Sequence, residues 1–406
     1  MNSTSNHALQ VLTDRCVRCG LCLPHCPTYL QSRQEGDGPR GRIALTEALA
    51  RGELAPTPRL QQHLDGCLSC RACEAVCPAQ VRFGELMDRG RALLAVQRPA
   101  RVRAARLASA LLRSRPRRRA LSLLLRVSRR LGLVGLARHG VFGRRLARAG
   151  ALLPPVLAAT APLLPPVAAE SDVLLFCGCV TELAEREVLE DAARLLTVAG
   201  YRVGAPAAQD CCGALLQHAG DLERARRLAR RNLATFGGTG MVAAITSGCA
   251  ASLRDYAWLV PEGGASFAAR VHDVGWLLQR RVERLHFKPL PLRAAVHLPC
   301  TLRNVVGEDR AMERLLCAVP EITLEPLQPA QRCCGAAGLQ IVTDAAAADR
   351  LLAGKLAAVR QRSPDLILSS NIGCSLHLAA GLSRAGLTTP VMHPLRLLAQ
   401  QLQPAG

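Results

Sequence analysis

Short apolar runs alternate with amphipathic stretches over residues 171–406. Between the runs, as at residues 181–200 and 345–361, apolar positions recur with the spacing of a helix. Strands that alternate with helices predict βαβ units and a mainly parallel sheet. We therefore expect a Rossmann-like α/β fold in this part of the chain. The apolar runs expected to be strands include residues 173–176, 242–245, 294–297 and 366–368.

The two halves of this part share one cysteine pattern. Each half has a cysteine after its first apolar run, then a Cys-Cys-Gly motif, then a Gly-Cys pair, with steps of 32 and 38 residues in one half and 33 and 41 in the other. This order and spacing predict an internal repeat. Sites in parallel sheets form where strands end, so we expect the cysteines to converge there. They are Cys179, Cys211, Cys212 and Cys249 in the first half, and Cys300, Cys333, Cys334 and Cys374 in the second.

Eight further cysteines lie in two runs near the N-terminus, each with the spacing Cys-x2-Cys-x2-Cys-x3-Cys-Pro. This is the spacing of bacterial proteins that hold two iron–sulfur clusters. Three closely spaced thiolates can bind three corners of one [4Fe–4S] cubane, while the fourth points away to the other cluster. The predicted ligands are Cys16, Cys19, Cys22 and Cys77 for one cluster, and Cys26, Cys67, Cys70 and Cys73 for the other.

A pair of structural zinc sites is the alternative interpretation of these runs. Zinc sites do not require that the fourth cysteine be followed by proline, yet both runs have this feature, so iron–sulfur clusters are favoured. Crossed ligation would bring the two clusters close together, which suits the passage of single electrons. The long segment between the runs has a helical pattern at residues 41–50, which favours an α-helical ferredoxin domain. Residues 37–42 fit either a turn beside a cluster or a solvated helix start.

The Cys-Cys-Gly motifs predict a further metal or redox role. Vicinal cysteines do not easily form a disulfide with each other, and four sulfurs per half are enough for a metal or cluster site. The alternative is that these are buried free cysteines acting as small apolar residues. Cys177 and Cys317 fall outside the pattern and are expected to pack in the interior. His297 is expected to be a hydrogen-bonded histidine at a strand end rather than a ligand.

The positive charge belongs to one segment. The formal net charge is +21, and residues 89–148 carry eighteen arginines and no acidic residue. The pattern fits contact with an acidic membrane surface, contact with an acidic partner subunit, or ordinary solvated helices. Nucleic acid is not expected, because aromatic residues make up 3% of the chain and no binding motif is present. Leucines recur at helical spacing within this segment at Leu107, Leu111, Leu112, Leu121, Leu124 and Leu125.

Residues 149–169 carry no charge and contain five prolines, which would break a membrane-spanning helix. We interpret this stretch as an extended linker. The N-terminus has no apolar signal-peptide core, so a cytoplasmic location with reduced cysteines is expected. The predicted divisions of an α+β multidomain chain are a ferredoxin domain at 1–97, an Arg-rich helical segment with a Pro-rich linker at 98–170, and cysteine-rich domains at 171–290 and 291–406.

No nucleotide-binding or hydrolase motif is present: the chain lacks G-x-G-x-x-G after a strand, a P-loop and G-x-S-x-G. We therefore expect neither FAD nor NAD in this chain, and no catalytic residue. The clusters could carry electrons, but nothing here would extract them from a substrate. A dehydrogenase partner is implied.

Taken together, these motifs resemble the iron–sulfur subunit of bacterial glycolate oxidase (glycolate dehydrogenase). The ferredoxin and Cys-Cys-Gly motifs are also similar to subunits of heterodisulfide reductase, anaerobic glycerol-3-phosphate dehydrogenase and lactate-oxidising systems. The local sequences at 37–43, 246–249 and 371–374 favour glycolate oxidase. The resemblance covers nearly the whole chain and is carried by CVRCGLC (16–22), DGPRGRI (37–43), CLSCRACE (67–74), TSGC (246–249), PCTL (299–302) and NIGC (371–374).

The resemblance implies a complex in which FAD-binding subunits oxidise glycolate to glyoxylate. This subunit would pass the electrons to a quinone or another acceptor at the cytoplasmic face of the inner membrane. The alternatives are the equivalent subunit of a glycerol-3-phosphate dehydrogenase, lactate dehydrogenase or heterodisulfide reductase-like complex, and, in a different class, a zinc-containing nucleic-acid-binding or scaffold protein. Heterodisulfide reductase-type domains often end in C-x2-C, whereas Thr246 and Asn371 occupy the first of these positions here. This departure argues against an unusual multi-iron catalytic cluster in both halves.

Overall fold

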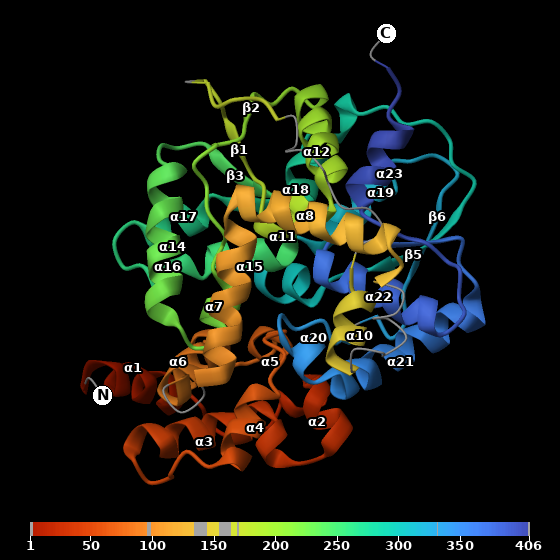
Figure 1. Cartoon of the computed structure of the whole chain (residues 1–406). Helices are drawn as coiled ribbons and strands as arrows, with labels where there is room; N and C mark the ends of the chain where they lie inside the picture. Colours follow the sequence, from red (N-terminus) through yellow and green to blue (C-terminus); the bar gives the residue numbers. More distant parts are fainter. Residues whose placement is uncertain are drawn as a thin grey trace. The chain divides into compact units, whose positions relative to one another are not determined.

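The computed structural model of the chain describes residues 3–95, 99–133, 144–153, 164–168, 170–330 and 332–404. It contains two compact units (Figure 1). The first unit comprises residues 1–109 and 213–228, and the second comprises residues 110–212 and 229–406.

The first unit is helical, as the pattern between the cysteine runs predicted. Proline at the first turn begins α2, α3 and α4, since proline fixes a helical φ where no backbone donor is needed. Thr57 caps α4 by accepting a hydrogen bond from the Leu60 amide. Leu12, Leu64 and Leu86 are buried in the core that these helices share. The helices are α1 (Ser3–Asp14), α2 (Pro27–Ser32), α3 (Pro39–Arg51), α4 (Pro58–Asp65), α5 (Ala72–Ala75) and α6 (Phe83–Leu94).

Helix α3 packs closely against the 3-10 turn at Glu35–Asp37. A Cβ atom at Gly41 would lie 2.0 Å from the carbonyl oxygen of Glu35, which is far inside van der Waals contact. Only glycine therefore fits at this position. The close approach fixes where residues 37–42 enter the helix.

The second unit contains two parallel four-stranded sheets with the same strand order, β2-β1-β3-β4 and β6-β5-β7-β8. In the first sheet Val173 pairs with Val203 and Met241, and in the second Ala294 pairs with Leu324 and Leu366. The predicted repeat and the parallel βαβ architecture are confirmed. The strands are β1 (Val173–Phe176), β2 (Val203–Gly204), β3 (Met241–Ala244), β4 (Val271–Asp273), β5 (Arg293–His297), β6 (Thr323–Pro326), β7 (Leu366–Ser369) and β8 (Val391–Met392).

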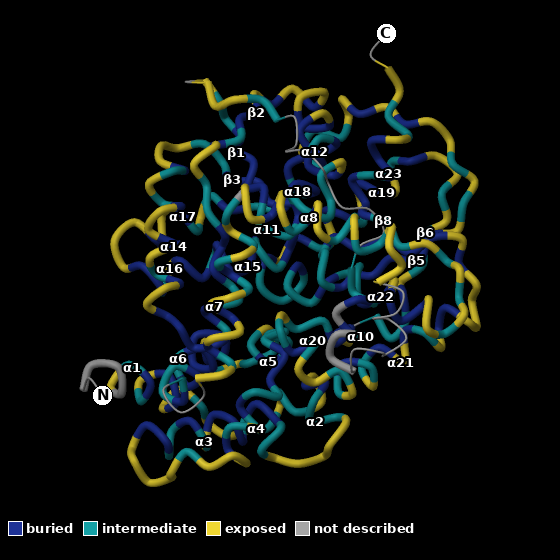
Figure 2. Tube along the Cα trace, in the orientation of Figure 1, coloured by how far each residue is buried: buried dark blue, intermediate teal, exposed yellow. Residues whose placement is uncertain are grey.

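Helices cover the sheets, and the central strand β1 is buried along its whole length (Figure 2). Strand β7 of the second sheet is buried along its whole length as well. Helix α12 packs against α23, and α18 packs against α19, so helices of the two halves contact one another. The helices after β1 are α11 (Cys179–Ala184), α12 (Arg186–Val198), α14 (Leu222–Thr235), α15 (Ser247–Arg254), α16 (Tyr256–Leu259), α17 (Gly264–Ala269), α18 (Val274–Gln279), α19 (Asp309–Leu316), α20 (Gln340–Thr343), α21 (Ala345–Arg362), α22 (Ile372–Arg384) and α23 (Pro394–Gln401), with a short α13 (Ala214–Gln217) in the first unit.

The described residues of the Arg-rich segment are mainly helical, as predicted, and form α7 (Pro99–Arg113), α8 (Arg115–Arg130) and α10 (Arg144–Ala151). Most of the predicted Pro-rich linker, including residues 154–163 and 169, lies outside the described residues. Residues 164–168 form neither helix nor strand. None of the described helices combines the length and the apolar composition needed to cross a bilayer.

We predict that Gly41→Ala lowers the free energy of unfolding by about 1–3 kcal/mol, because a methyl group cannot fit against the Glu35 carbonyl. The clash outweighs the gain of up to about 1 kcal/mol in helix propensity. Denaturant unfolding followed by circular dichroism measures the change. Gly237→Ala is the control, since its Cβ would come no closer than 3.6 Å to any atom. Equal stability of the two variants would contradict the packing argument.

Candidate cluster and thiolate sites

The two N-terminal cysteine runs form the same loop. In each, the residues on either side of the second cysteine have left-handed backbone: φ is 56° at Arg18 and 82° at Gly20, and 52° at Ser69 and 56° at Arg71. Residues other than glycine rarely adopt this backbone conformation unless the surrounding structure enforces it. Each run therefore forms a tight loop, which is needed if several of its sulfurs are to bind one metal centre.

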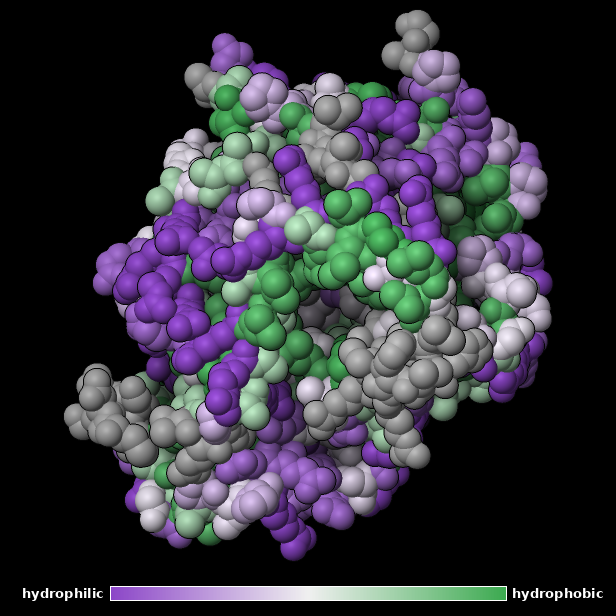
Figure 3. All heavy atoms as spheres, viewed as in Figure 1, coloured by the Kyte–Doolittle hydropathy of each residue, from purple (hydrophilic) through white to green (hydrophobic). Residues whose placement is uncertain are grey.

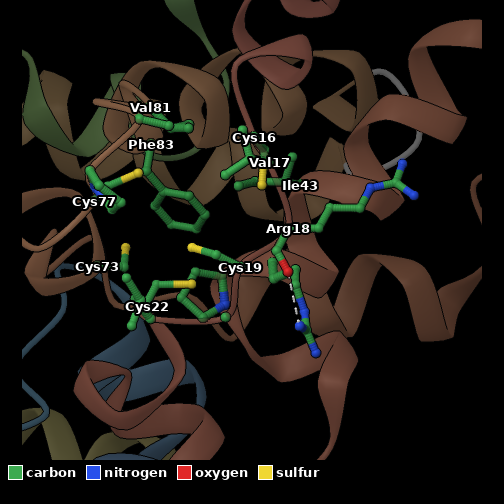
Figure 4. Close-up of a pocket in the computed structure, with 16 residues that line it drawn as sticks. Cys16, Val17, Arg18, Cys19, Cys22, Ile43, Cys73, Cys77, Val81 and Phe83 are labelled. Carbon is green, nitrogen blue, oxygen red and sulfur yellow. Dashed lines mark hydrogen bonds between the residues drawn. The ribbon is translucent and has the colours of Figure 1, made fainter.

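The first cysteine group lines a single pocket. Cys16, Cys19 and Cys22 come from the first loop, and Cys77 comes from the end of the second run (Figure 4). Cys73 also lines this pocket. The predicted ligands of the first cluster, including the one contributed by the other run, therefore face one space. Burial raises the pKa of Cys22, and the neighbouring Cys16 and Cys19 raise it further.

The second cysteine group surrounds Cys73, which is buried in the first turn of α5. Burial raises the pKa of Cys73 well above its usual value, and Cys70, Cys67 and Cys26 raise it further. Cys26 belongs to the first run in the sequence, but it is close enough to Cys73 of the second run to raise its pKa. Cys26 and Cys77 thus each lie near cysteines of the other run, as crossed ligation would require.

Residues 37–42 lie beside these cysteines rather than in a plain solvated turn. Arg40 lines the pocket and donates to the carbonyl of Arg18, 3.2 Å away (Figure 4). The main-chain oxygen of Asp37 accepts from Thr28, and the Cys26 sulfur lies 3.7 Å from the same oxygen. Buried Arg42 donates to the Thr28 hydroxyl and to the carbonyl of His63. This motif therefore ties the two cysteine runs together.

A second buried arginine holds the other cysteine loop. Arg91 on α6 is 1% exposed and donates to the carbonyls of Leu64 and Cys67 and to the hydroxyl of Ser69. Its guanidinium lies 3.9 Å from the buried carboxylate of Asp88. The burial of Arg42 and Arg91 could not be predicted from the sequence, because one arginine among fifty carries no signal of burial.

Each Cys-Cys-Gly half brings its four cysteines together at the carboxyl ends of its strands, as predicted. We call Cys179, Cys211, Cys212 and Cys249 the first quartet, and Cys300, Cys333, Cys334 and Cys374 the second quartet. Sulfur–sulfur distances are 3.5 Å for Cys179–Cys211, 3.7 Å for Cys212–Cys249, 3.9 Å for Cys300–Cys333 and 3.1 Å for Cys334–Cys374. The hydrogen bond to Cys211 and burial raise the pKa of Cys179 well above its usual value.

Thr246 and Asn371, which replace the first cysteine of a C-x2-C motif in the two halves, have structural roles. Asn371 caps α22 by accepting from the amides of Gly373 and Cys374. Its amide nitrogen also donates to the hydroxyl of Ser247, which is hydrogen-bonded in turn to Thr301 across the two halves. The hydroxyl of Thr246 bonds to that of Thr181 at 3.3 Å. A polar bridge therefore links the two halves beside the quartets.

The predictions for three residues outside the quartets can be compared with the structure. Cys177 is buried, as predicted, and accepts from Gln209. The prediction for Cys317 was wrong, because this cysteine follows the last turn of α19 and is exposed. His297 bonds to Ser369 at the end of β5, as predicted, but also lies close to Cys334 and Cys374. Burial lowers the pKa of His297 to about 3.

The fold and these sites define an iron–sulfur protein with a helical two-cluster domain and two cysteine-rich α/β domains. The "4Fe-4S dicluster domain" family matches residues 13–81. The "Cysteine-rich domain" family matches residues 173–254 and 294–379.

Similar proteins narrow this class. The "Probable glycolate oxidase iron-sulfur subunit" of Bacillus subtilis is 32% identical, with 93% of this chain and 90% of the relative covered. The "Glycolate oxidase iron-sulfur subunit" of Escherichia coli is 32% identical, with 96% and 94% covered. "Lactate utilization protein A" of Geobacillus thermodenitrificans is 26% identical, with 56% and 98% covered. The chain belongs to the family of glycolate oxidase iron–sulfur subunits.

The N-terminal residues fit the clusters that this family implies. Eight thiols stand in two groups, which is the kind and number of ligands that two thiolate-ligated [4Fe–4S] clusters need. The loops that bear the thiols are held by hydrogen bonds that do not use the sulfurs. The protein thus carries two [4Fe–4S] clusters in this domain.

We predict that Arg91→Lys loosens the second cysteine loop. Lysine keeps the charge but cannot reach both carbonyls and the Ser69 hydroxyl in one geometry, so roughly 2–4 kcal/mol of buried hydrogen bonding is lost. Cluster absorbance near 400 nm should then disappear at a lower denaturant concentration than in the wild type. Arg59→Lys, at an exposed position, is the control. An unchanged midpoint for Arg91→Lys would show that the loop does not depend on this arginine.

Proposed function

We propose that this chain is the iron–sulfur electron-transfer subunit of a glycolate oxidase complex. A FAD-binding partner oxidises glycolate to glyoxylate, and this chain passes the electrons to a quinone or another acceptor. The observation that carries the proposal is the crossed grouping of eight N-terminal cysteines in a chain 32% identical to glycolate oxidase iron–sulfur subunits over nearly its whole length. No catalytic residue for the substrate is assigned to this chain.

The proposed ligands follow the two groups. Cys16, Cys19, Cys22 and Cys77 hold one cluster, and Cys26, Cys67, Cys70 and Cys73 hold the other. Bound clusters supply one-electron oxidation and reduction at potentials set by burial and by hydrogen bonds to sulfur. The shared pocket and the neighbours of Cys73 support this assignment.

The protein's own residues position the clusters and control their exposure. Arg42 and Arg91 hold the cysteine loops in place through backbone carbonyls. Cys73 is buried, whereas Cys19 is exposed between the exposed apolar residues Val17 and Leu21. The first cluster would thus have an edge near the surface, where a partner's cofactor can approach, and the second would be shielded from water.

The cysteine quartets are proposed to hold a further metal or to act as redox thiols. Their sulfurs lie close together in pairs at the ends of parallel strands, where sites commonly form. We propose the divisions 1–97, 98–170, 171–290 and 291–406 for the ferredoxin domain, the Arg-rich and Pro-rich segment, and the two cysteine-rich domains.

An equivalent role with lactate as donor is the second candidate, favoured by the 26% identity to lactate utilization protein A over 56% of the chain. The substrate that donates the electrons would bind to the partner subunit, so this chain does not select it. Purifying the assembled complex and measuring dye reduction with glycolate, lactate and glycerol 3-phosphate distinguishes these candidates. Faster reduction with lactate or glycerol 3-phosphate would overturn glycolate.

Peripheral contact with the cytoplasmic face of the inner membrane is also proposed, through helix α8. This helix is inverted relative to an ordinary surface helix, whose apolar stripe faces the core. Arg118 is buried and pairs with Glu182, while Leu123, Leu124 and Val127 are 57%, 62% and 44% exposed. Figure 3 shows the resulting hydrophobic band along α8.

Arginines flank this apolar face. Arg117, Arg119 and Arg130 are exposed, and no acidic residue occurs anywhere in residues 89–169. An apolar stripe flanked by arginines is typical of helices that lie in the interface of an anionic bilayer. Each arginine near such a surface contributes about 1 kcal/mol of attraction.

We predict that Cys19→Ser or Cys70→Ser abolishes electron transfer from glycolate in the assembled complex, since each removes one ligand of a proposed cluster. The iron content should fall from about eight atoms per chain toward about four. Cys317→Ser, at an exposed cysteine outside every motif, is the control and should keep iron and turnover. Full iron content and turnover in either ligand variant would contradict the assignment.

We predict that replacing Leu123, Leu124 and Val127 together by Gln weakens binding to vesicles of anionic phospholipid at least tenfold, or about 1.4 kcal/mol. This variant keeps the Arg113–Asp210 and Arg118–Glu182 ion pairs intact. A deletion of residues 113–119 would remove both pairs and would therefore be a less specific test. Co-sedimentation at low and high salt measures binding, with Leu54→Gln as control because Leu54 is also exposed. Equal co-sedimentation of both variants would show that α8 is an ordinary solvated helix.

A further inference from the structure

The second quartet differs from the first by a buried histidine. His297 at the end of β5 has a ring nitrogen that lies within 4.8 Å of the sulfurs of both Cys334 and Cys374, and these two sulfurs lie 3.1 Å apart. All three residues are buried. Among the histidine, cysteine, aspartate and glutamate side chains of the described residues, this is the one group of three that converges so tightly.

The internal repeat provides a comparison for this position. His297 lies three residues before Cys300, as Phe176 lies three residues before Cys179. Its strand partner Ser369 lies five residues before Cys374, as Ala244, the partner of Phe176, lies five before Cys249.

The first half therefore carries an apolar Phe–Ala pair where the second carries His–Ser. In the first half Phe176 packs against Phe236, with ring centroids 5.9 Å apart. The strand end thus forms without a histidine, so burial of the polar pair in the second half needs another explanation.

One ring nitrogen of His297 is hydrogen-bonded within the protein, an arrangement compatible with a metal ligand. Its Nδ1 is 3.3 Å from the hydroxyl of Ser369. Metal-binding histidines usually donate one ring N–H to such a partner, which orients the ring and leaves the other nitrogen for the metal. Ser369 can take this role, whereas Ala244 in the first half cannot.

The spacing of the sulfurs fits a single four-coordinate ion. A tetrahedral ion with metal–sulfur bonds of 2.3 Å sets its sulfurs about 3.8 Å apart. The sulfurs of Cys334 and Cys374, which are both proposed ligands, lie 3.1 Å apart, close enough for one ion to bind both. Thiolates on a cubane bind different irons and stand further apart.

The local charge favours mixed nitrogen and sulfur ligation. Lys355 is 1% exposed, donates to the carbonyls of Leu327 and Pro329, and interacts electrostatically with Cys333, Cys334 and Cys374. A divalent ion with three thiolates and one imidazole has a net charge of −1, which one lysine neutralises. Four thiolates would add one further negative charge in a buried place, where Arg303 is the other cation that acts on His297 and Lys355.

We propose that His297, Cys334 and Cys374, with one sulfur of the Cys300–Cys333 pair, form a mononuclear site for a thiophilic divalent cation, for which Zn²⁺ is the best match. The proposal rests on the metal role proposed above for the second quartet and assigns it one nitrogen donor. Because the site is buried and four-coordinate, the ion is structural. It joins the ends of β5 and β7 and the Cys-Cys-Gly loop after β6.

The test compares the full-length wild type with the double variant His297→Phe, Ser369→Ala. This variant reproduces the pair of the first half, so the strand end should still pack. Each protein is purified without oxygen, given one equivalent of Zn²⁺ and desalted. Zinc and iron are then counted by mass spectrometry, and zinc ligation is measured by X-ray absorption. The matched control is His393→Asn, which changes another buried histidine of the same unit, bonded to Ile245 rather than to a cysteine.

We expect one zinc in the wild type and in His393→Asn, with one imidazole and three sulfurs. In the double variant the imidazole signal should vanish and zinc affinity in chelator competition should fall at least 100-fold. Zinc with sulfur ligands alone, no retained zinc in the wild type, or unchanged affinity in the double variant would overturn the proposal. So would iron beyond about eight atoms that is lost in Cys374→Ser, since it indicates a cluster. The N-terminal iron, counted in every sample, reports separately on the proposed electron-transfer function.

Discussion

Sulfur ligands can be buried together only if positive charge and hydrogen bonds compensate for the loss of water, and the architecture of this protein meets that constraint repeatedly. Burial raises the pKa of Cys73 well above its usual value, so a thiolate there needs a cation nearby. In the ferredoxin domain the iron of a bound cluster would supply that charge. The same requirement holds in the second quartet, where Lys355 lies beside the sulfurs.

Arginine serves two opposite purposes in this chain. Arg42 and Arg91 are buried and bind backbone carbonyls, so they shape the cysteine loops without occupying a sulfur. The arginines of α8 either anchor the helix, as Arg118 does through Glu182, or flank an exposed apolar face. Because the guanidinium has several donors in a fixed plane, one residue type can satisfy both demands.

The duplicated halves show how one fold acquires two different sites. Both use strand ends and a Cys-Cys-Gly loop to gather four sulfurs. They then diverge at positions that packing alone does not decide: His297 and Ser369 stand where Phe176 and Ala244 stand in the first half. Asn371, at one of the two positions where a C-x2-C motif would have its first cysteine, donates a hydrogen bond to Ser247 and so links the halves.

The sequence by itself determined the features that depend on local spacing: the two cysteine runs, the helical ferredoxin domain and the repeated parallel sheets. Apolar periodicity and cysteine intervals report on residues a few positions apart, which is the range over which helices, strands and ligand loops form. The tertiary structure alone decided which arginines are buried, that α8 turns its leucines outward, that Cys317 is exposed, and that His297 meets Cys374, 77 positions further along the chain. These features depend on which faces pack together, and a pattern along one segment contains no information about the segment that will cover it.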